Sequence, residues 1–177
     1  LDLAMADADP ADIDMILASD PDGDRLAVAL PDSSGSWVRL TGDQVGTLLA
    51  DHLISHGDGP DRLVAMSLMS SRLLLARAAD AGIEAQVTLT GFKWVARPIV
   101  ERPDLTYVLG YEEALGYCVG SQVRDKDGIS AALVMAEAAA TARHRGQTLW
   151  DRLDELARRF GVHQTGPVTL RFDGPDG

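Results

Sequence analysis

The chain has 177 residues, 46% of them hydrophobic and 24% charged, and its formal net charge is −11 at pH 7. This composition predicts a folded protein with a packed core, and the acidic balance argues against a nucleic-acid partner. No apolar run reaches the roughly 20 residues that span a bilayer, so we expect no membrane partner. The single cysteine, Cys118, is typical of a reducing compartment, which favours a cytoplasmic location.

Strand-like and helix-like patterns alternate along the chain, which is typical of the α/β class. The first forty residues predict the end of a helix, two short strands and a turn. These elements are expected at residues 1–8, 13–18, 26–30 and 31–36. An aspartate-rich loop leaves the carboxyl end of the first strand.

A second unit begins near Thr41, which stands three residues before Gln44 as in a capping box. Helices are expected from Thr41 to Gly57 and at residues 73–81, 95–101, 129–143 and 148–160, and strands at residues 63–68, 84–88 and 105–109. A loop is expected at residues 90–94. The connection 110–127 is polar and shows little regular pattern. We therefore expect a mixed sheet with flanking helices.

These patterns divide the chain into three parts. Residues 1–40 end one domain, residues 41–163 form a further α/β domain, and residues 164–177 are a linker or the start of another domain. In this last part, residues 168–172 are expected to begin a strand. Because the sequence opens on Leu1 and ends in glycine, aspartate and proline, we expect a piece of a longer protein.

Three polar loops that contain glycine leave the carboxyl ends of predicted strands, at residues 19–25, 89–94 and 110–127. Ligands bind outside these strand ends in open α/β sheets. The sequence therefore predicts a ligand site to which all three loops contribute.

Asp20, Asp22 and Asp24 stand at alternate positions of the first loop, where a bent backbone can turn their carboxylates onto one hard divalent cation. An EF-hand is excluded, because the sixth and twelfth positions from Asp20 hold Arg25 and Pro31 instead of glycine and glutamate. Mg²⁺ fits better, since it takes few carboxylates and shares a phosphate oxygen that Arg25 can face. The alternative is a polar turn with solvated aspartates.

Charged side chains also occupy the other two loops. In Gly110–Tyr117, one carboxylate of the pair Glu112 and Glu113 can accept hydrogen bonds from neighbouring sugar hydroxyls, or the pair forms an exposed acidic turn. In Gly91–Trp94, Lys93 can meet a phosphate, whereas core packing is favoured for the aromatic side chains.

Lys126 and Asp127 precede the Ala-rich helix expected at residues 129–143. A helix N-terminus favours anions, so Lys126 beside it can bind phosphate or transfer a proton. The alternative is ordinary capping by Asp127 with an exposed lysine, and the two interpretations are compatible.

Together these segments resemble the α-D-phosphohexomutase superfamily, which includes phosphoglucomutases and phosphomannomutases. Asp20–Arg25 is similar to its magnesium loop, and Gly91–Trp94 to a loop near its substrate. Glu112–Ala114 is similar to its sugar-recognition loop, and Lys126–Gly128 to the Lys-Asp-Gly segment that follows. The four segments stand in the family's order over nearly the whole chain. The resemblance implies a phosphoglucomutase-like, three-layer α/β/α domain.

The resemblance also implies a role for each matching residue. Asp20, Asp22 and Asp24 would hold Mg²⁺, and Arg25 would lie beside the metal and the transferring phosphate. Lys126 would lie near the reacting groups as a general acid/base, and the sugar hydroxyls would bind to a glutamate. The substrate-binding residues implied in this way are Gly91, Lys93, Glu112 and Glu113.

The implied reaction is an intramolecular phosphoryl transfer that interconverts 1-phospho and 6-phospho (or 5-phospho) sugars through a phosphoserine and a bisphosphate. Ala114 stands where many family members have serine, so glucose, mannose and pentose phosphates all stay open as substrates. The family's serine-bearing and distal-phosphate-binding segments have no match here. We therefore expect the end of the second domain and the third domain, with the missing domains of the same polypeptide as partners and no activity alone.

Two other hypotheses stay open. The chain could be a non-catalytic module that binds a sugar phosphate or a divalent metal, which micromolar sugar-phosphate affinity of the chain alone would favour. It could also be a calcium-binding structural domain, which predicts a larger melting shift with Ca²⁺ than with Mg²⁺.

Overall fold

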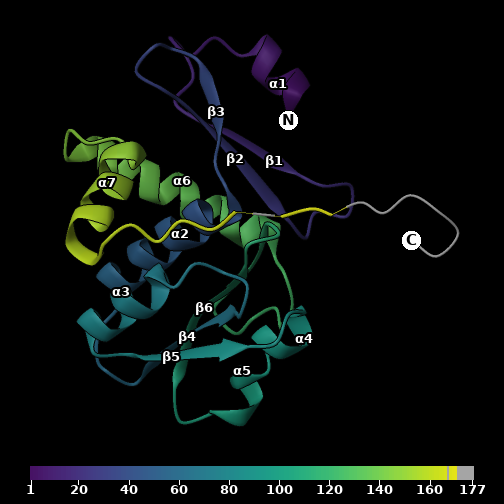
Figure 1. The fold of residues 1–177 in the computed structure, drawn as a ribbon, viewed down its shortest axis with the longest axis vertical. Coiled ribbons are helices and arrows are strands. Elements are labelled where there is room, and N and C mark those ends of the chain that lie inside the picture. The colour runs from purple at the N-terminus through teal and green to yellow at the C-terminus, as the bar shows by residue number, and fades with distance from the viewer. Residues whose placement is uncertain (167, 171–177) are drawn as a thin grey trace, which may run out of the picture.

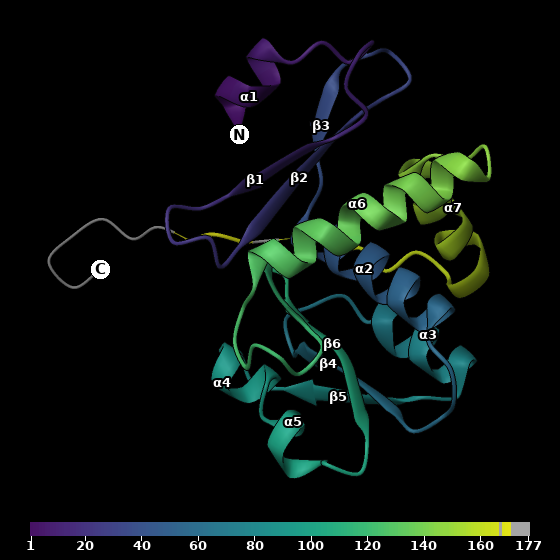
Figure 2. The same ribbon diagram turned by 180° about the vertical axis from the view of Figure 1, so that it is seen from behind.

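The computed structural model describes residues 1–166 and 168–170, which form two β-sheets with surrounding helices (Figure 1, Figure 2). The strands are β1 Ile16–Ser19, β2 Leu26–Pro31, β3 Trp37–Arg39, β4 Arg62–Ser67, β5 Glu84–Thr88, β6 Thr106–Glu112 and β7 Gly116–Val119. The helices are α1 Asp2–Asp7, α2 Gly42–His56, α3 Leu73–Ala81, α4 Phe92–Val95, α5 Pro98–Glu101, α6 Gly128–His144 and α7 Leu149–Phe160.

The smaller sheet is antiparallel, in the order β1-β2-β3. Strands β1 and β2 were predicted, whereas β3 was not, because three residues are too few to show an alternating pattern. The turn before β3 fixes its position. In that turn the Asp32 carboxylate accepts hydrogen bonds from the backbone N–H groups of Ser34 and Ser36, at 2.8 and 2.9 Å.

The larger sheet has the order β5-β4-β6-β7, in which β4 is parallel to β5 and β6, and β7 is antiparallel to β6. Side chains of β4 alternate between two hydrophobic clusters. Val64 and Met66 face the cluster that contains α2, α3 and α6, whereas Leu63 and Ala65 face the cluster that contains α4. Helices therefore cover both faces of a mixed sheet, which confirms the predicted α/β class and its three layers (Figure 1).

Local signals set the helix ends, as predicted. Thr41 caps α2 in a capping box, where its Oγ1 accepts from Gln44 N at 3.2 Å and Gln44 Oε1 accepts from Thr41 N at 2.8 Å. Gly82 ends α3 in the left-handed region with φ 66°. Asp127 caps α6.

Three predicted segments differ from the structure. The prediction of an irregular connection at 110–127 is wrong in its first part, because β6 continues to Glu112 and β7 pairs with it in the antiparallel direction. The loop at 90–94 and the helix at 95–101 are instead α4 and α5, which separate at Pro98 because proline has no N–H to continue the first helix. Of the strand expected at 168–172, residues 168–170 form no strand and residues 171–172 lie outside the described residues.

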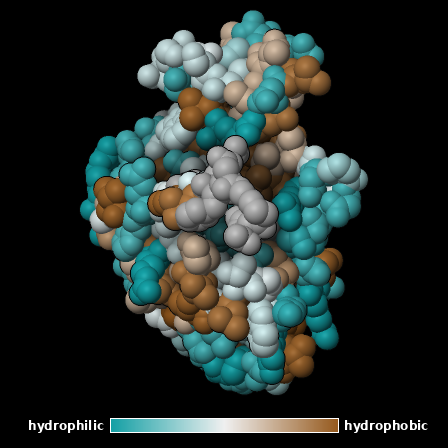
Figure 3. Space-filling view, turned by 45° about the vertical axis from the view of Figure 1, so that its right-hand side comes forward, coloured by the Kyte–Doolittle hydropathy of each residue, from teal (hydrophilic) through white to brown (hydrophobic). Residues whose placement is uncertain are grey.

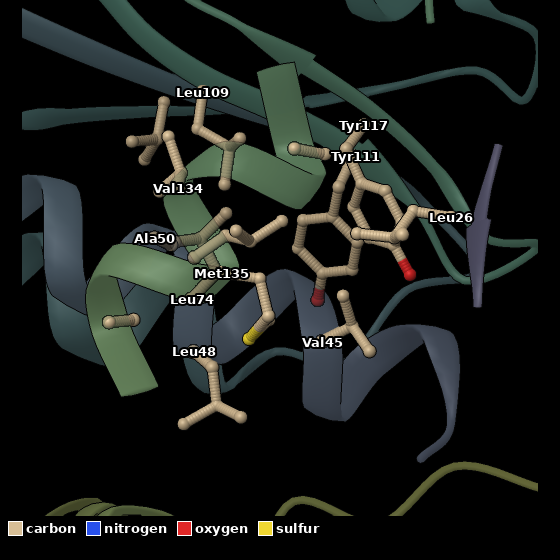
Figure 4. Close-up of a cluster of buried hydrophobic side chains, with 14 of the residues drawn as sticks. Leu26, Val45, Leu48, Ala50, Leu74, Leu109, Tyr111, Tyr117, Val134 and Met135 are labelled. Carbon is tan, nitrogen blue, oxygen red and sulfur yellow. The ribbon is translucent and has the colours of Figure 1, made fainter. Parts of the chain in front are cut away.

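The core continues from the smaller sheet into the larger unit. Leu26 of β2 belongs to the same buried cluster as Val45 of α2, Met135 of α6 and the tyrosines Tyr111 and Tyr117 of β6 and β7 (Figure 4). All five side chains are fully buried. The two sheets are therefore packed on one shared core.

The backbones of the two sheets also meet. Leu26 N donates a hydrogen bond to Leu115 O at 3.2 Å, and Arg25 forms an antiparallel bridge with Gly116. The loop between β1 and β2 is thereby held against the turn between β6 and β7.

The surface seen in Figure 3 is largely hydrophilic, with several separate hydrophobic patches. In residues 1–166 and 168–170, none of the helices combines the length and apolar character that crossing a bilayer requires.

Candidate functional site

The three aspartates of the β1–β2 loop lie together. Asp20, Asp22 and Asp24 each offer a carboxylate oxygen, and these atoms lie within 4.8 Å of one another. Gly23 supplies the left-handed turn, with φ 75°, that brings the carboxylates together. A cluster of solvent-accessible carboxylate oxygens is the donor set that suits a hard divalent cation, so the residues fit Mg²⁺.

Arg25 closes this loop. Its backbone N–H donates to Asp20 Oδ1 at 3.1 Å, and this hydrogen bond holds the pKa of Asp20 below its usual value. The Arg25 side-chain Nε lies 3.9 Å from carboxylate oxygens of both Asp20 and Asp24. The half-exposed guanidinium is therefore beside the aspartates, where it can meet an anion.

Lys126 reaches the same aspartate loop from the start of α6. Its Nζ lies 2.8 Å from Asp24 Oδ2 and 3.2 Å from Asp125 Oδ1, and it lies 5.3 Å from the centroid of the Phe92 ring. Hydrogen bonding to Asp24 is the main cause that raises the pKa of Lys126, so the side chain is a cation here. An ammonium in this position can donate a proton or bind a phosphate oxygen.

Gly116 makes room for this lysine. A Cβ at Gly116 would lie 2.8 Å from Lys126 Cδ and 2.6 Å from Phe92 Cε2. The methylene stem of Lys126 therefore crosses the glycine at the start of β7, with Phe92 beside it. Neither Gly116 nor Phe92 was among the predicted site residues, because only the folded structure brings them to Lys126.

Glu112 joins the second and third predicted loops. It is 9% exposed, and its Oε1 accepts a hydrogen bond from the backbone N–H of Gly91. Gly91 has φ 111°, a conformation that favours glycine. The carboxylate of Glu112 and the start of α4 therefore lie together.

Glu113 points away from Glu112 and toward the end of β4. Its Oε2 accepts hydrogen bonds from Ser67 Oγ at 3.0 Å and Ser70 Oγ at 3.4 Å, while its N–H donates to Ser70 Oγ at 3.2 Å. Ser67 and Ser70 are both buried. Glu113 therefore anchors the β6–β7 turn to the neighbouring strand.

Lys93 is exposed and lies apart from these contacts. Its Nζ is 5.6 Å from the ring centroid of Trp94, and Arg97 lies 5.2 Å from the same ring. Trp94 is half-buried, whereas Phe92 is buried as predicted. The structure thus brings together Asp20, Asp22, Asp24, Arg25 and Lys126, joins Glu112 to Gly91, and leaves Lys93 and Glu113 with other partners.

The start of α6 touches the backbone of the aspartate loop. Asp127 Oδ1 accepts from Ile129 N at 3.1 Å. A Cβ at Gly128 would lie 2.5 Å from Arg25 O and 2.8 Å from Gly23 O. The glycine thus permits a close approach that places Lys126 at the aspartates.

The family model that matches this chain and two of its relatives are all named as phosphomutases. Residues 41–160 match the family model described as phosphoglucomutase/phosphomannomutase, alpha/beta/alpha domain III. The chain is 40% identical over 172 residues to a "Probable phosphomannomutase" of Haemophilus influenzae. The aligned region covers 97% of this chain and 34% of the relative. It is 35% identical over 175 residues to a phosphopentomutase of Mus musculus, which covers 93% of this chain and 28% of the relative.

A crystal structure from Thermus thermophilus, named as a phosphomannomutase, has a similar fold. Its TM-score to this chain is 0.71 at 26% sequence identity, over 84% of this chain and 31% of that one. The chain spans about a third of the length of the curated relatives it matches.

Proposed function

Because the chain belongs to the phosphoglucomutase/phosphomannomutase family, we propose that it provides the metal-binding and sugar-recognition parts of a Mg²⁺-dependent sugar phosphomutase. Such an enzyme interconverts 1-phospho and 6-phospho (or 5-phospho) sugars. The contact between Lys126 Nζ and Asp24 Oδ2, at 2.8 Å, supports this best, since it joins a candidate acid/base to a candidate metal site.

In this proposal Asp20, Asp22 and Asp24 hold the metal. When bound there, Mg²⁺ would neutralise negative charge at the transferred phosphoryl group. Arg25 faces an oxygen of the same group through its guanidinium. The main contribution of these residues is positioning and charge stabilisation, as in phosphoryl transfer generally.

The phosphoryl group would come from a phosphoserine outside this chain. The bond from phosphorus to the serine oxygen breaks while a bond to a sugar hydroxyl oxygen forms, and one proton passes overall from the sugar hydroxyl to the serine. Lys126 is the residue of this chain proposed to carry that proton. The resulting sugar bisphosphate then returns its other phosphate to the serine.

The sugar would be held at Glu112, beside Gly91, and Lys93 of the same loop is the candidate partner for its phosphate. A carboxylate can accept hydrogen bonds from two neighbouring hydroxyls, which is the spacing a sugar ring offers. The relatives are named for mannose, glucose and pentose phosphates, and any of these is compatible with Ala114 in the β6–β7 turn. Without the phosphoserine the chain alone is expected to be inactive.

Replacing Asp22 tests the proposal in the full-length protein. We expect Asp22→Ala to lower the isomerisation rate of a sugar monophosphate by roughly a hundredfold or more, because charge stabilisation is lost in the transition state. The Mg²⁺ affinity measured by calorimetry should fall as well. Asp58→Ala, at an exposed acid of another loop, is the matched control. An Asp22→Ala enzyme with unchanged turnover and unchanged circular dichroism would remove the metal role.

A further inference from the structure

Asp43, the second residue of α2, is buried without a basic partner among the described residues. It is 7% exposed. Its Oδ1 accepts hydrogen bonds from Ser71 N at 2.6 Å and from the Tyr111 hydroxyl at 3.0 Å, and its Oδ2 accepts one from the Thr165 hydroxyl. Three donors therefore point at a single carboxyl group that the proposed reaction does not use.

These donors come from three separate segments. Ser71 lies in the β4–α3 connection, Tyr111 lies in β6, and Thr165 lies in the segment that follows α7. Ser71 makes a second contact to that segment, since its Oγ donates to His163 O at 2.9 Å. The start of α2 is thus tied to residues 163–165 on one side and to the larger sheet on the other.

Hydrogen bonds rather than packing hold the segment after α7. A cavity of about 390 Å³ lies against it, lined in part by Asp43, Thr47, Leu73 and Trp150 together with residues 161–165. Residues 161–165 are all exposed. The hydrogen bonds to Asp43 and Ser71 therefore tie residues 163–165 to α2 and to the β4–α3 connection.

The same network reaches the predicted sugar loop at two points. Tyr111 immediately precedes Glu112, and Ser71 follows Ser70, whose Oγ accepts from Glu113 N at 3.2 Å. The start of α2 also touches the loop directly, because a Cβ at Gly42 would lie 1.9 Å from Glu113 O. Asp43 is therefore packed beneath the β6–β7 turn.

A buried carboxylate is costly, and the start of α2 does not require one, since Thr41 already caps the helix. Hydrogen bonds to an ionised acceptor are roughly twice as strong as neutral ones, and the helix N-terminus favours the charge. These hydrogen bonds hold three segments in a fixed arrangement around the Asp43 carboxylate. Such an arrangement is useful where the geometry of a binding loop matters.

We propose that Asp43 is a positioning residue of the phosphomutase site, which couples the segment 163–165 to the Glu112–Glu113 loop. Its role in sugar binding rests on the proposed function, whereas the coupling itself does not. A change at residues 163–165 would then alter the order of the sugar loop through Asp43.

Hydrogen exchange on the chain itself tests the coupling. We expect Asp43→Asn to speed amide exchange at residues 112–116 by roughly tenfold, because the charge-assisted bonds beneath the loop weaken. Thr165→Val changes only an exposed residue, so it keeps the test valid if Asp43→Asn does not fold. It should speed exchange at the same amides by a smaller factor.

Two control variants separate coupling from general destabilisation. Asp51→Asn removes the charge of another buried carboxylate of α2, farther along the helix, which accepts hydrogen bonds from Arg77 and Arg152. Gln164→Ala changes the residue next to Thr165. Neither should speed exchange at residues 112–116 selectively. Equal effects of Asp43→Asn and Asp51→Asn on the loop, or no effect of Thr165→Val, would overturn the proposal.

Kinetics of the full-length enzyme give the second measurement. Thr165→Val should raise the KM for the sugar phosphate more than it lowers kcat, since the loop is misplaced while the metal loop is untouched. If the full-length protein has no phosphomutase activity, the proposed function fails, and the exchange experiment still decides the coupling. An unchanged KM together with faster loop exchange would overturn the role in sugar binding.

Discussion

At the scale of single residues, Asp51 shows how the chain stabilises a buried charge. It is 3% exposed, and its carboxylate lies 2.7 Å from Arg77 Nε and 2.6 Å from Arg152 Nε. Burial on its own raises the pKa of Asp51, but hydrogen bonds from Arg152 and Arg77 outweigh it and hold the pKa below its usual value. This one side chain therefore connects α2 with α3 and α7.

The lowered pKa of Asp51 predicts a pH-dependent contribution to stability. A carboxyl group whose pKa is lower in the folded state stabilises the fold above its unfolded pKa of about 3.9, and the contribution is lost as the pH falls through the folded value. We expect Asp51→Asn to lower the free energy of unfolding by about 3–5 kcal/mol at neutral pH, because two arginines lose their buried partner. Urea denaturation of both proteins should show this difference shrinking below about pH 4.

Glu155 offers a control for this experiment. It contacts Arg152 at 2.6 Å but is half exposed, so Glu155→Gln should cost no more than about 1 kcal/mol at any pH. A difference between wild type and Asp51→Asn that is independent of pH would show that Asp51 does not contribute through its charge.

At the scale of elements, the start of α6 is held in place by its approach to the aspartate loop. Gly128 lies where a Cβ would come within 2.5 Å of Arg25 O. Alanine is normally favoured over glycine in a helix by about 1 kcal/mol, but here the added methyl group meets backbone atoms that cannot rotate away. At position 128, replacing glycine by alanine is therefore expected to destabilise the fold instead of stabilising it.

We expect Gly128→Ala to lower the melting temperature and to weaken divalent-metal binding, because the loop that carries Asp20, Asp22 and Asp24 must move. Calorimetry measures the first effect, and a Mn²⁺ titration followed by electron spin resonance measures the second. Gly166→Ala is the control, since nothing lies within 4 Å of its added Cβ. A Gly128→Ala protein with normal melting and normal Mn²⁺ affinity would contradict the close approach.

At the scale of the whole molecule, the two sheets share one core and are expected to unfold together. Leu26 of the smaller sheet is fully buried among side chains of α2, α6 and the larger sheet. Unfolding of either sheet would therefore expose the same cluster. This arrangement predicts one cooperative transition.

Two of the three tryptophans make that prediction measurable. Trp37 lies in β3 and Trp94 in α4, so variants that keep either one as the only tryptophan, with Trp150 also replaced, report on the two sheets separately. We expect coincident denaturation midpoints, and Leu26→Ala should lower both by the same amount, at a cost of about 2–5 kcal/mol. Two separated midpoints would show that the sheets unfold independently.

Local patterns in the sequence were sufficient for much of this architecture. The capping box at Thr41 and the glycine after Ala81 are recognisable within a few residues, and both are present in the structure. The spacing of Asp20, Asp22 and Asp24 likewise predicted that their carboxylates converge. These features depend on contacts between near neighbours in the chain.

Features that depend on distant residues could not be predicted in the same way. Strand β7 is four residues long, and it is defined by pairing with β6 rather than by its own pattern. Glu113 turns toward Ser67, 46 residues away, and Gly116 is needed only because Lys126 and Phe92 meet there. Side-chain direction and close approach follow from tertiary packing, which local spacing does not contain.

The bond from Leu26 N to Leu115 O and the bridge between Arg25 and Gly116 have a consequence for how such a protein can evolve. Backbone atoms make both contacts, so apart from the glycine required at position 116 they depend less on which side chains the two loops carry than on how many residues the loops contain. A substitution at the exposed Ala114 leaves them intact, whereas a one-residue insertion or deletion in either loop would shift the aspartates relative to the β6–β7 turn. We therefore expect the length of the two loops to be constrained more tightly than the identity of residue 114.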